Sequence, residues 1–287
     1  MKYLPNKLRE MYERELRLMR VTELGERYIN EIDVLRGYFI LADFFTDPSS
    51  NTEIESMLVG VRDANLLSSA ILRQVVSLGK KMKYTQDIDI CATLFFGLVK
   101  NHAFLDGNKR VAMLTLLYQL NKYNYFPKAS PEDFEHLVLA VAANELRVKY
   151  EWVWEKEANK EDREVQVIAS MLRKMTEKKD HSFHLTITSR EFIDVLTKAN
   201  VLCEIKNSKL RLTNTTMNLQ GEEVVWKYAL DFGGDTRPLG PKTVREALQA
   251  LQIYDQYPSY KNIMEGREPF YQLIADFEQP FRRLKDE

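Results

Sequence analysis

Disulfides and strong net charge are both missing from this 287-residue sequence. It contains only two cysteines, Cys91 and Cys203, which lie far apart in apolar surroundings. We therefore expect reduced core residues rather than a disulfide framework. The 41 Lys and Arg residues nearly balance the 42 Asp and Glu residues, which leaves a net charge of -1. Such a balance gives no sign of a nucleic-acid or membrane partner.

Long hydrophobic stretches are also scarce. Charged residues interrupt every apolar run before it reaches the roughly 20 residues of a membrane span. The first five residues lead into charged sequence and not into the apolar core of a signal peptide. We therefore expect a cytoplasmic protein without a membrane segment.

The most informative stretch is the polar segment of residues 101–110, Asn-His-Ala-Phe-Leu-Asp-Gly-Asn-Lys-Arg. An apolar run precedes it at residues 90–99, and a second one follows it at residues 111–120. Both runs have the length and composition of buried helices. A connection between two buried helices does not need so many polar groups for packing, but a phosphate site would need them.

Each residue type in this segment suits a phosphate site. Gly107 permits a turn that points backbone amides at an anion, and Asn108, Lys109 and Arg110 would then begin the second helix, where N–H groups attract phosphate oxygens. Asp106 is an oxygen ligand suited to Mg²⁺, and His102 could accept a hydroxyl proton as a general base. The alternative is a helix-capping loop with a solvated charge cluster.

These residues resemble the Fic/Doc family, whose motif reads His-x-Phe-x-Asp/Glu-Gly-Asn-Gly/Lys-Arg. A second likeness lies upstream, where Gly60-Val61-Arg62-Asp63 and the Leu-Leu and Ser-Ala pairs that follow resemble a segment of death-on-curing (Doc-like) members. The resemblance covers residues 32–150 and implies a helical domain. Its members transfer a phosphate-containing group from a nucleotide to a protein hydroxyl.

The resemblance also implies a role for each matching residue. His102 would be the base, Asp106 the Mg²⁺ ligand, and Gly107 with Asn108 the anion hole, while Arg110 would pair with phosphate. ATP would be the substrate, and the acceptor would be a hydroxyl of a target protein. Doc-like toxins also rely on a separate antitoxin chain, which makes such a chain a second candidate partner.

The transferred group stays open, because the motif combines features of both branches. Members that transfer AMP have glycine where this chain has Lys109, and a second arginine where it has Met113. A lysine resembles Doc, which transfers the terminal phosphate, although Doc itself often has alanine at the position of Gly107. Lys109 and Met113 favour phosphorylation, and AMPylation is the alternative. A non-catalytic nucleotide-binding adaptor is the second alternative.

The remaining sequence suggests four parts. Residues 1–31 form an amphipathic helix that packs on the next part, contacts a partner or helps to form a homodimer, and residues 32–150 are the Fic/Doc-like catalytic domain. Residues 151–180 are a helical linker, and residues 181–287 are an α+β module whose mixed charge argues against RNA binding. We therefore predict a mainly α-helical domain followed by a smaller α+β domain. Residues 46–57 occupy the place of the family's target-docking flap, with a plain surface loop as the alternative.

Within these parts the residue patterns predict individual elements. Apolar residues at helical spacing predict a helix from residue 7 to about residue 30 and another over residues 66–83. Residues 183–188 alternate as a strand should, and Ser189 is a good cap for a helix over residues 190–198. An aromatic stripe within residues 268–285 predicts a helix that closes onto one domain.

Overall fold

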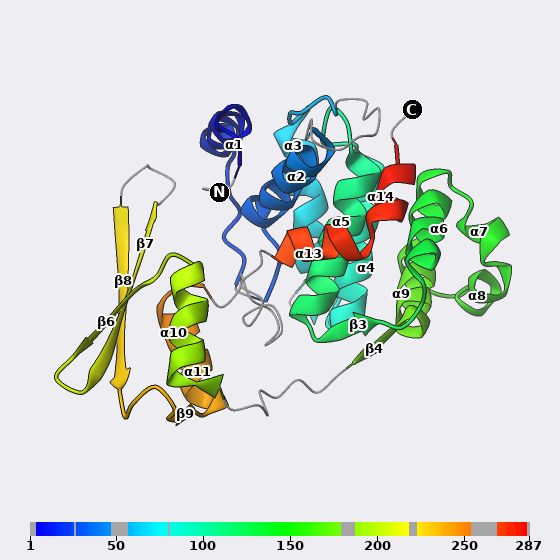
Figure 1. The fold of residues 1–287 in the computed structure, drawn as a ribbon. Coiled ribbons are helices and arrows are strands. Elements are labelled where there is room, and N and C mark those ends of the chain that lie inside the picture. The colour runs from blue at the N-terminus through cyan, green and yellow to red at the C-terminus, as the bar shows by residue number, and fades with distance from the viewer. Residues whose placement is uncertain are drawn as a thin grey trace. The chain divides into compact units, whose positions relative to one another are not determined.

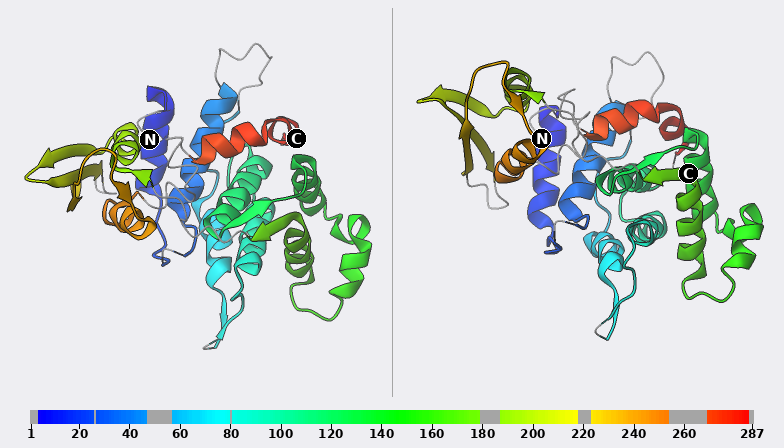
Figure 2. Two further views of the ribbon diagram at one scale, coloured as in Figure 1. Left: turned by 60° about the horizontal axis from the view of Figure 1, so that its bottom comes forward. Right: turned by 90° about the horizontal axis from the view of Figure 1, so that it is seen from below.

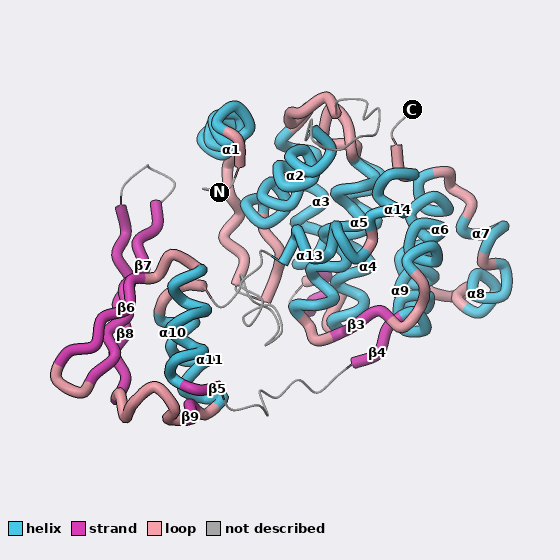
Figure 3. Tube along the Cα trace, in the orientation of Figure 1, coloured by secondary structure: helices cyan, strands magenta, loops and turns pink. Residues whose placement is uncertain are grey.

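A computed structural model describes residues 4–25, 27–46, 57–79, 81–178, 187–217, 223–253 and 269–285. The chain divides into two compact units, of which unit 1 comprises residues 1–178 with 273–287, and unit 2 comprises residues 179–272. Figure 1 labels the elements, and Figure 3 distinguishes helices from strands. Unit 1 is mainly helical, and unit 2 contains a three-stranded sheet, which confirms the predicted fold class.

Helices build most of unit 1. They are α1 (Asn6–Leu18), α2 (Glu31–Thr46), α3 (Ala64–Leu72), α4 (Asp87–Asn101), α5 (Asn108–Lys122), α6 (Pro131–Ala142), α7 (Leu146–Lys149), α8 (Glu151–Lys156), α9 (Arg163–Met175) and α14 (Glu278–Arg283). The chain returns from unit 2 to unit 1 within α13 (Pro269–Asp276). Among the described helices, none has both the length and the apolar character needed to cross a membrane.

Helices α4 and α5 lie side by side at the centre of unit 1 (Figure 1). Nearly every α5 side chain between Asn108 and Leu120 is buried, and α4 is buried along most of its length. A helix that is apolar on all sides needs neighbours around it, and α2, α3, α6 and α9 supply them. At Gly97 of α4 an added Cβ would lie 3.0 Å from the Ala70 Cα, so α3 and α4 can approach closely only because residue 97 is glycine.

The N-terminal helix is shorter than the sequence suggests. We expected a helix from residue 7 to about residue 30, but α1 ends at Leu18. The chain then turns, and the buried Glu31 carboxylate accepts hydrogen bonds from the Thr22 N–H and hydroxyl at 2.9 and 2.6 Å. Helix α1 packs on α2 through an edge-to-face contact between Tyr12 and Phe39, whose ring centroids are 5.5 Å apart.

The segment of residues 66–83, which we predicted to be one helix, is divided into several elements. Helix α3 ends at Leu72, a 3-10 turn covers Arg73–Val75, and β1 (Ser77–Leu78) pairs with β2 (Lys81–Met82) in an antiparallel hairpin. Figure 2 shows this hairpin projecting from the helices of unit 1. Val76 and Leu78 are exposed, so the apolar spacing that suggested a longer helix did not reflect burial.

The predicted linker of residues 151–180 belongs to unit 1 as far as Lys178. After α9, β4 (Thr176–Lys178) pairs antiparallel with β3 (Tyr125–Pro127), the strand that follows α5. This pairing joins the end of α9 to the end of the central helix. The C-terminal residues 273–287 also belong to unit 1, so the predicted module of residues 181–287 was wrong at its C-terminal end.

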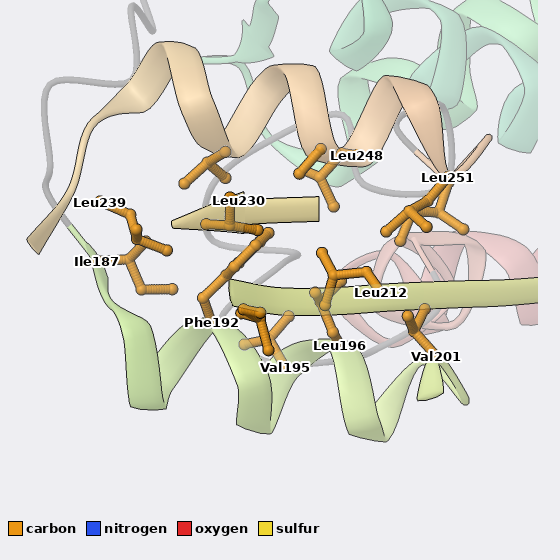
Figure 4. Packing of buried hydrophobic residues seen from close by; sticks show 14 residues of the cluster. Ile187, Phe192, Val195, Leu196, Val201, Leu212, Leu230, Leu239, Leu248 and Leu251 are labelled. Carbon is orange, nitrogen blue, oxygen red and sulfur yellow. The ribbon is translucent and has the colours of Figure 1, made fainter. Parts of the chain in front are cut away.

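Unit 2 places two helices against a sheet. Its elements are β5 (Ile187–Thr188), α10 (Ser189–Lys198), β6 (Leu202–Lys206), β7 (Lys209–Met217), β8 (Glu223–Asp231), β9 (Pro238–Leu239) and α11 (Pro241–Ala250). The antiparallel sheet has the order β6-β7-β8, and β5 pairs separately with β9. Leu212 of β7 points into a core with Phe192 of α10 and Leu248 of α11 (Figure 4), and Leu210 is buried in the same cluster.

Two sequence predictions concern the start of α10 and the strand before it. The residue that caps α10 is Thr188 and not Ser189, because the Thr188 hydroxyl accepts from the Glu191 N–H and the Glu191 carboxylate accepts from the Thr188 N–H. We predicted a strand at residues 183–188, of which 183–186 lie outside the described residues and 187–188 form β5. Cys91 is buried and Cys203 is half-buried, and neither forms a disulfide.

Candidate active site

The candidate site is the loop between α4 and α5, and left-handed residues lie at both of its ends. His102 follows the last residue of α4 at φ 48° and ψ 52°, and Gly107 precedes α5 at φ 78°. Glycine adopts such angles without strain, whereas histidine does so at some cost. The first residue therefore reverses the chain as it leaves one central helix, and the second directs it into the next. The His102 side chain is exposed at this turn.

The buried Asn108 side chain holds the loop through two hydrogen bonds. Its side-chain Oδ1 accepts a hydrogen bond from the Phe104 N–H at 2.9 Å, and its Nδ2 donates to the Phe104 carbonyl at 3.0 Å. Both residues are buried, and the Phe104 ring stacks on the Tyr38 ring with centroids 4.1 Å apart. The sequence suggested an anion-hole role for Asn108. In the structure its side chain is engaged in holding the loop, so its backbone N–H is the group that could face an anion.

A second segment, residues 60–63, is hydrogen-bonded to the backbone of the loop. The Arg62 and Asp63 N–H groups donate to the Ala103 carbonyl at 2.8 and 3.2 Å, and the Leu105 N–H donates to the Gly60 carbonyl at 3.0 Å. The Gly60 N–H in turn donates to the Tyr38 hydroxyl at 3.0 Å. The structure thus brings together the two motifs that the sequence analysis singled out, separated by about forty residues in the chain.

Asp106 lies just before the start of α5, where its carboxylate is half-exposed. One oxygen accepts from the Gly107 N–H at 2.5 Å, and the other accepts from the Leu58 N–H at 3.3 Å. A carboxylate oxygen can accept more than one bond, so capacity remains for a cation. Among the described residues, no group of three or more His, Cys, Asp or Glu side chains could hold a metal ion. A single carboxylate suits Mg²⁺ that is held mainly by substrate phosphates and water.

Gly107 has a packing requirement as well as a conformational one. A Cβ at this position would lie 2.9 Å from the Met57 Cε and 3.2 Å from its sulfur. Met57 is itself buried. Glycine at position 107 therefore lets the Met57 side chain pack directly against the backbone at the start of α5. Residues 47–56 of the expected flap lie outside the described residues, and Thr46 ends α2.

The two cations at the start of α5 have different surroundings. Lys109 is half-buried, whereas Arg110 is buried with 6% of its surface exposed. The Arg110 Nε donates to the Phe281 carbonyl of α14 at 2.9 Å, and the guanidinium carbon lies 4.4 Å from the Phe45 ring centroid. A cation over an aromatic ring is held by the negative face of that ring. The C-terminal helix therefore takes part in positioning Arg110.

Sequence reasoning did not identify the residues that hold Arg110. Phe281 is 171 residues away in the chain, and its contact uses a backbone carbonyl that no side-chain pattern encodes. The only available signal was the aromatic spacing of the last segment, which suggested a helix closing onto one domain. That helix is anchored by Arg283, whose Nη2 lies 2.6 Å from a Glu135 carboxylate oxygen on α6. Met113, where a second arginine would stand, is fully buried.

Comparison with known proteins identifies one family. A family model described as the Fic/DOC family matches residues 30–120. The matched range contains the segment of residues 60–63, the loop after α4 and almost all of α5. Neither a curated protein nor a solved structure matches the chain.

Proposed function

We propose that this protein uses ATP to modify a hydroxyl group of a target protein. The proposal starts from the match of residues 30–120 to the Fic/DOC family, because a Fic domain supports a Fic-type transferase in general. One observation carries the proposal more than any other. The exposed His102 lies at the end of one central helix, and five residues later Gly107 begins the next, within a loop that Asn108 and residues 60–63 hold in place. A base and a helix N-terminus are thereby fixed close together in the chain, as transfer of a phosphate-containing group from ATP requires.

His102 acts as the general base in this proposal. Its imidazole accepts the proton of the target hydroxyl while the hydroxyl oxygen attacks a phosphorus atom of ATP. One P–O bond forms and another breaks. Attack on the γ-phosphorus releases ADP, and attack on the α-phosphorus releases pyrophosphate. The exposure of His102 supports this role because a protein substrate can reach the imidazole.

The start of α5 binds the phosphates in this proposal. Backbone N–H groups at a helix N-terminus attract anions, and Lys109 adds a positive charge at the same place. Asp106 would hold Mg²⁺, and the bound ion would neutralise part of the phosphate charge. Arg110 contributes through its charge, while its Nε is held by Phe281.

Phosphoryl transfer is the version that we favour. Lys109 stands where AMP-transferring members have glycine, and Met113 offers no second phosphate clamp. The burial of Met113 supports this reading, because a side chain enclosed in the core cannot reach a nucleotide. Lys109→Gly should therefore reduce phosphoryl transfer and admit some AMP transfer.

The test uses ATP labelled separately at the α- and γ-phosphates, with a cell lysate as the source of targets. Protein labelled only from γ-ATP supports phosphorylation, and protein labelled only from α-ATP refutes it in favour of AMP transfer. His102→Ala is the matched control, and loss of general-base catalysis should slow labelling roughly 100- to 10,000-fold. ATP binding should survive this substitution. Unchanged labelling by His102→Ala would exclude His102 as the base, and a lack of labelling by the wild type would favour an adaptor.

A further inference from the structure

Arg62 lies beside the candidate active site, and the proposed chemistry does not yet use it. Its N–H donates to the Ala103 carbonyl at 2.8 Å, so its backbone is joined to the residue that follows His102. Its side chain is exposed, and its Nη2 lies 3.5 Å from the Asn101 carbonyl, the residue that precedes His102. Arg62 thus contacts both chain neighbours of the candidate base.

The backbone around Arg62 is held on both sides. The Gly60 carbonyl accepts from Leu105, and the Gly60 N–H donates to the buried Tyr38 hydroxyl. After Arg62, Asp63 caps α3 by accepting from the Asn65 N–H at 2.8 Å. A side chain that starts from a fixed backbone loses less entropy when it binds a ligand. The position of Arg62 is therefore prepared before any ligand arrives.

The guanidinium of Arg62 has only a weak interaction with the protein. Among the described residues, its hydrogen-bond partner is the Asn101 carbonyl, at the long distance of 3.5 Å. The neighbouring carboxylate of Asp63 is already used as the α3 cap. A guanidinium forms shorter and stronger bonds with phosphate oxygens, often two in parallel. A phosphate near His102 would thus be a much better partner than the carbonyl.

Helix α5 supplies few arginine contacts for the phosphates of a nucleotide. The Arg110 Nε is engaged with Phe281, and the guanidinium is buried against Phe45. Position 113 is a buried methionine. Lys109 can contribute a point charge but not a planar fork. Arg62 is an exposed guanidinium that reaches the carbonyl of Asn101, the residue before the candidate base.

We propose that Arg62 is a nucleotide-binding residue that pairs with a phosphate group of ATP beside His102. This inference rests on the proposed function, since it requires a nucleotide at this loop. Arg62 supplies the bidentate contact that Met113 does not provide, from a different element of the fold. It binds and positions the phosphates and takes no part in proton transfer.

The experiment measures nucleotide affinity of the full-length protein by titration calorimetry. Arg62→Ala should weaken ATP binding about thirtyfold, the effect of losing one charge-assisted contact. Arg62→Lys keeps the charge but loses the fork, so its loss should be smaller, about threefold to tenfold. Arg17→Ala is the control, because Arg17 is an exposed arginine of α1, and it should bind ATP within about twofold of the wild type.

A series of nucleotides separates phosphate binding from a structural role. ATP, ADP, AMP and adenosine are titrated into the wild type and Arg62→Ala. The affinity ratio between the two proteins should fall to about one at the first ligand that lacks the contacted phosphate, and it should be about one for adenosine. An equal loss for all four ligands would show that Arg62 supports the fold and would overturn the inference.

Failure of this inference differs from failure of the proposed function. If the wild type binds ATP and Arg62→Ala binds it equally well, Arg62 is not a phosphate ligand and the transferase proposal stands. If the wild type binds ATP and transfers no label, the transferase proposal fails while the affinity ratios still decide the role of Arg62. If the wild type binds no nucleotide, both are refuted.

Discussion

Removing the Asn108 side chain should both destabilise the protein and impair its proposed activity. Asn108 is 4% exposed and bonds to the N–H and carbonyl of Phe104 at 2.9 and 3.0 Å. Phe104 is 1% exposed, so water cannot easily replace the lost partners. Asn108→Ala therefore leaves a buried donor and a buried acceptor without the bonds that now satisfy them.

The magnitude follows from these two bonds. A neutral hydrogen bond contributes about 1 kcal/mol net, and an unsatisfied buried polar group costs about 1–3 kcal/mol. We therefore expect Asn108→Ala to lower the free energy of unfolding by about 2–4 kcal/mol. His102 is two residues before Phe104, so relaxation of the loop should also displace the imidazole. A misplacement of about 1 Å can slow catalysis on the order of a hundredfold.

The assay pairs urea denaturation with the labelled-ATP transfer measurement. Asn65→Ala is the control, because Asn65 is an exposed asparagine on α3 that should tolerate the change within about 0.5 kcal/mol. Asn108→Asp keeps the acceptor for the Phe104 N–H but has no amide to donate to the carbonyl, so it should also be destabilised. If Asn108→Ala is as stable as the control and transfers label at the wild-type rate, the loop does not depend on these bonds.

Two other predictions concern the frame around the site. Gly97→Ala places a Cβ 3.0 Å from the Ala70 Cα and should lower the free energy of unfolding, measured by urea denaturation, by about 1–3 kcal/mol. Gly25→Ala is the control, because a Cβ there meets open space and should change stability little. Equal stability of the two variants would refute the close packing of α3 and α4. Burial and a hydrogen bond to Asp162 raise the pKa of Tyr84 to about 12. The stability that comes from protonated Tyr84 is thus complete below its unfolded pKa of about 10 and is lost as the pH rises through about 12. Between about pH 9 and about pH 11, the wild type should lose about 1 kcal/mol more than Tyr84→Phe, and parallel pH curves would contradict this.

Much of the candidate site could be predicted because it is nearly continuous in the sequence. The apolar runs on either side of residues 101–110 imply two buried helices, and Gly107 with the polar residues around it implies a turn that faces an anion. The structure forms these helices as α4 and α5, with Gly107 at φ 78°. A pattern of this kind depends on local preferences and on the burial of neighbouring residues, and both can be read from residue types.

The sequence predicted less well where local signals compete. Residues 66–83 have apolar side chains at helical spacing, yet the chain leaves the helix after Leu72 and forms a hairpin with exposed Leu78. The amphipathic start of the chain likewise ends its helix at Leu18, and the buried Glu31 fixes the following turn through Thr22. Periodicity alone does not say which apolar side chains find a partner, so element ends were its weakest predictions.

Residue types and their spacing alone thus determined the mainly helical first unit, the α+β second unit and the positions of His102, Asp106 and Gly107 in one loop. Only the tertiary structure placed Arg62 next to that loop and brought the Phe281 carbonyl to Arg110. It also assigned the last residues of the chain to unit 1. These contacts join segments that are far apart in sequence, and several use backbone groups that every residue carries. Because such groups leave no signature in residue identity, only the packing of the helices decides which of them meet.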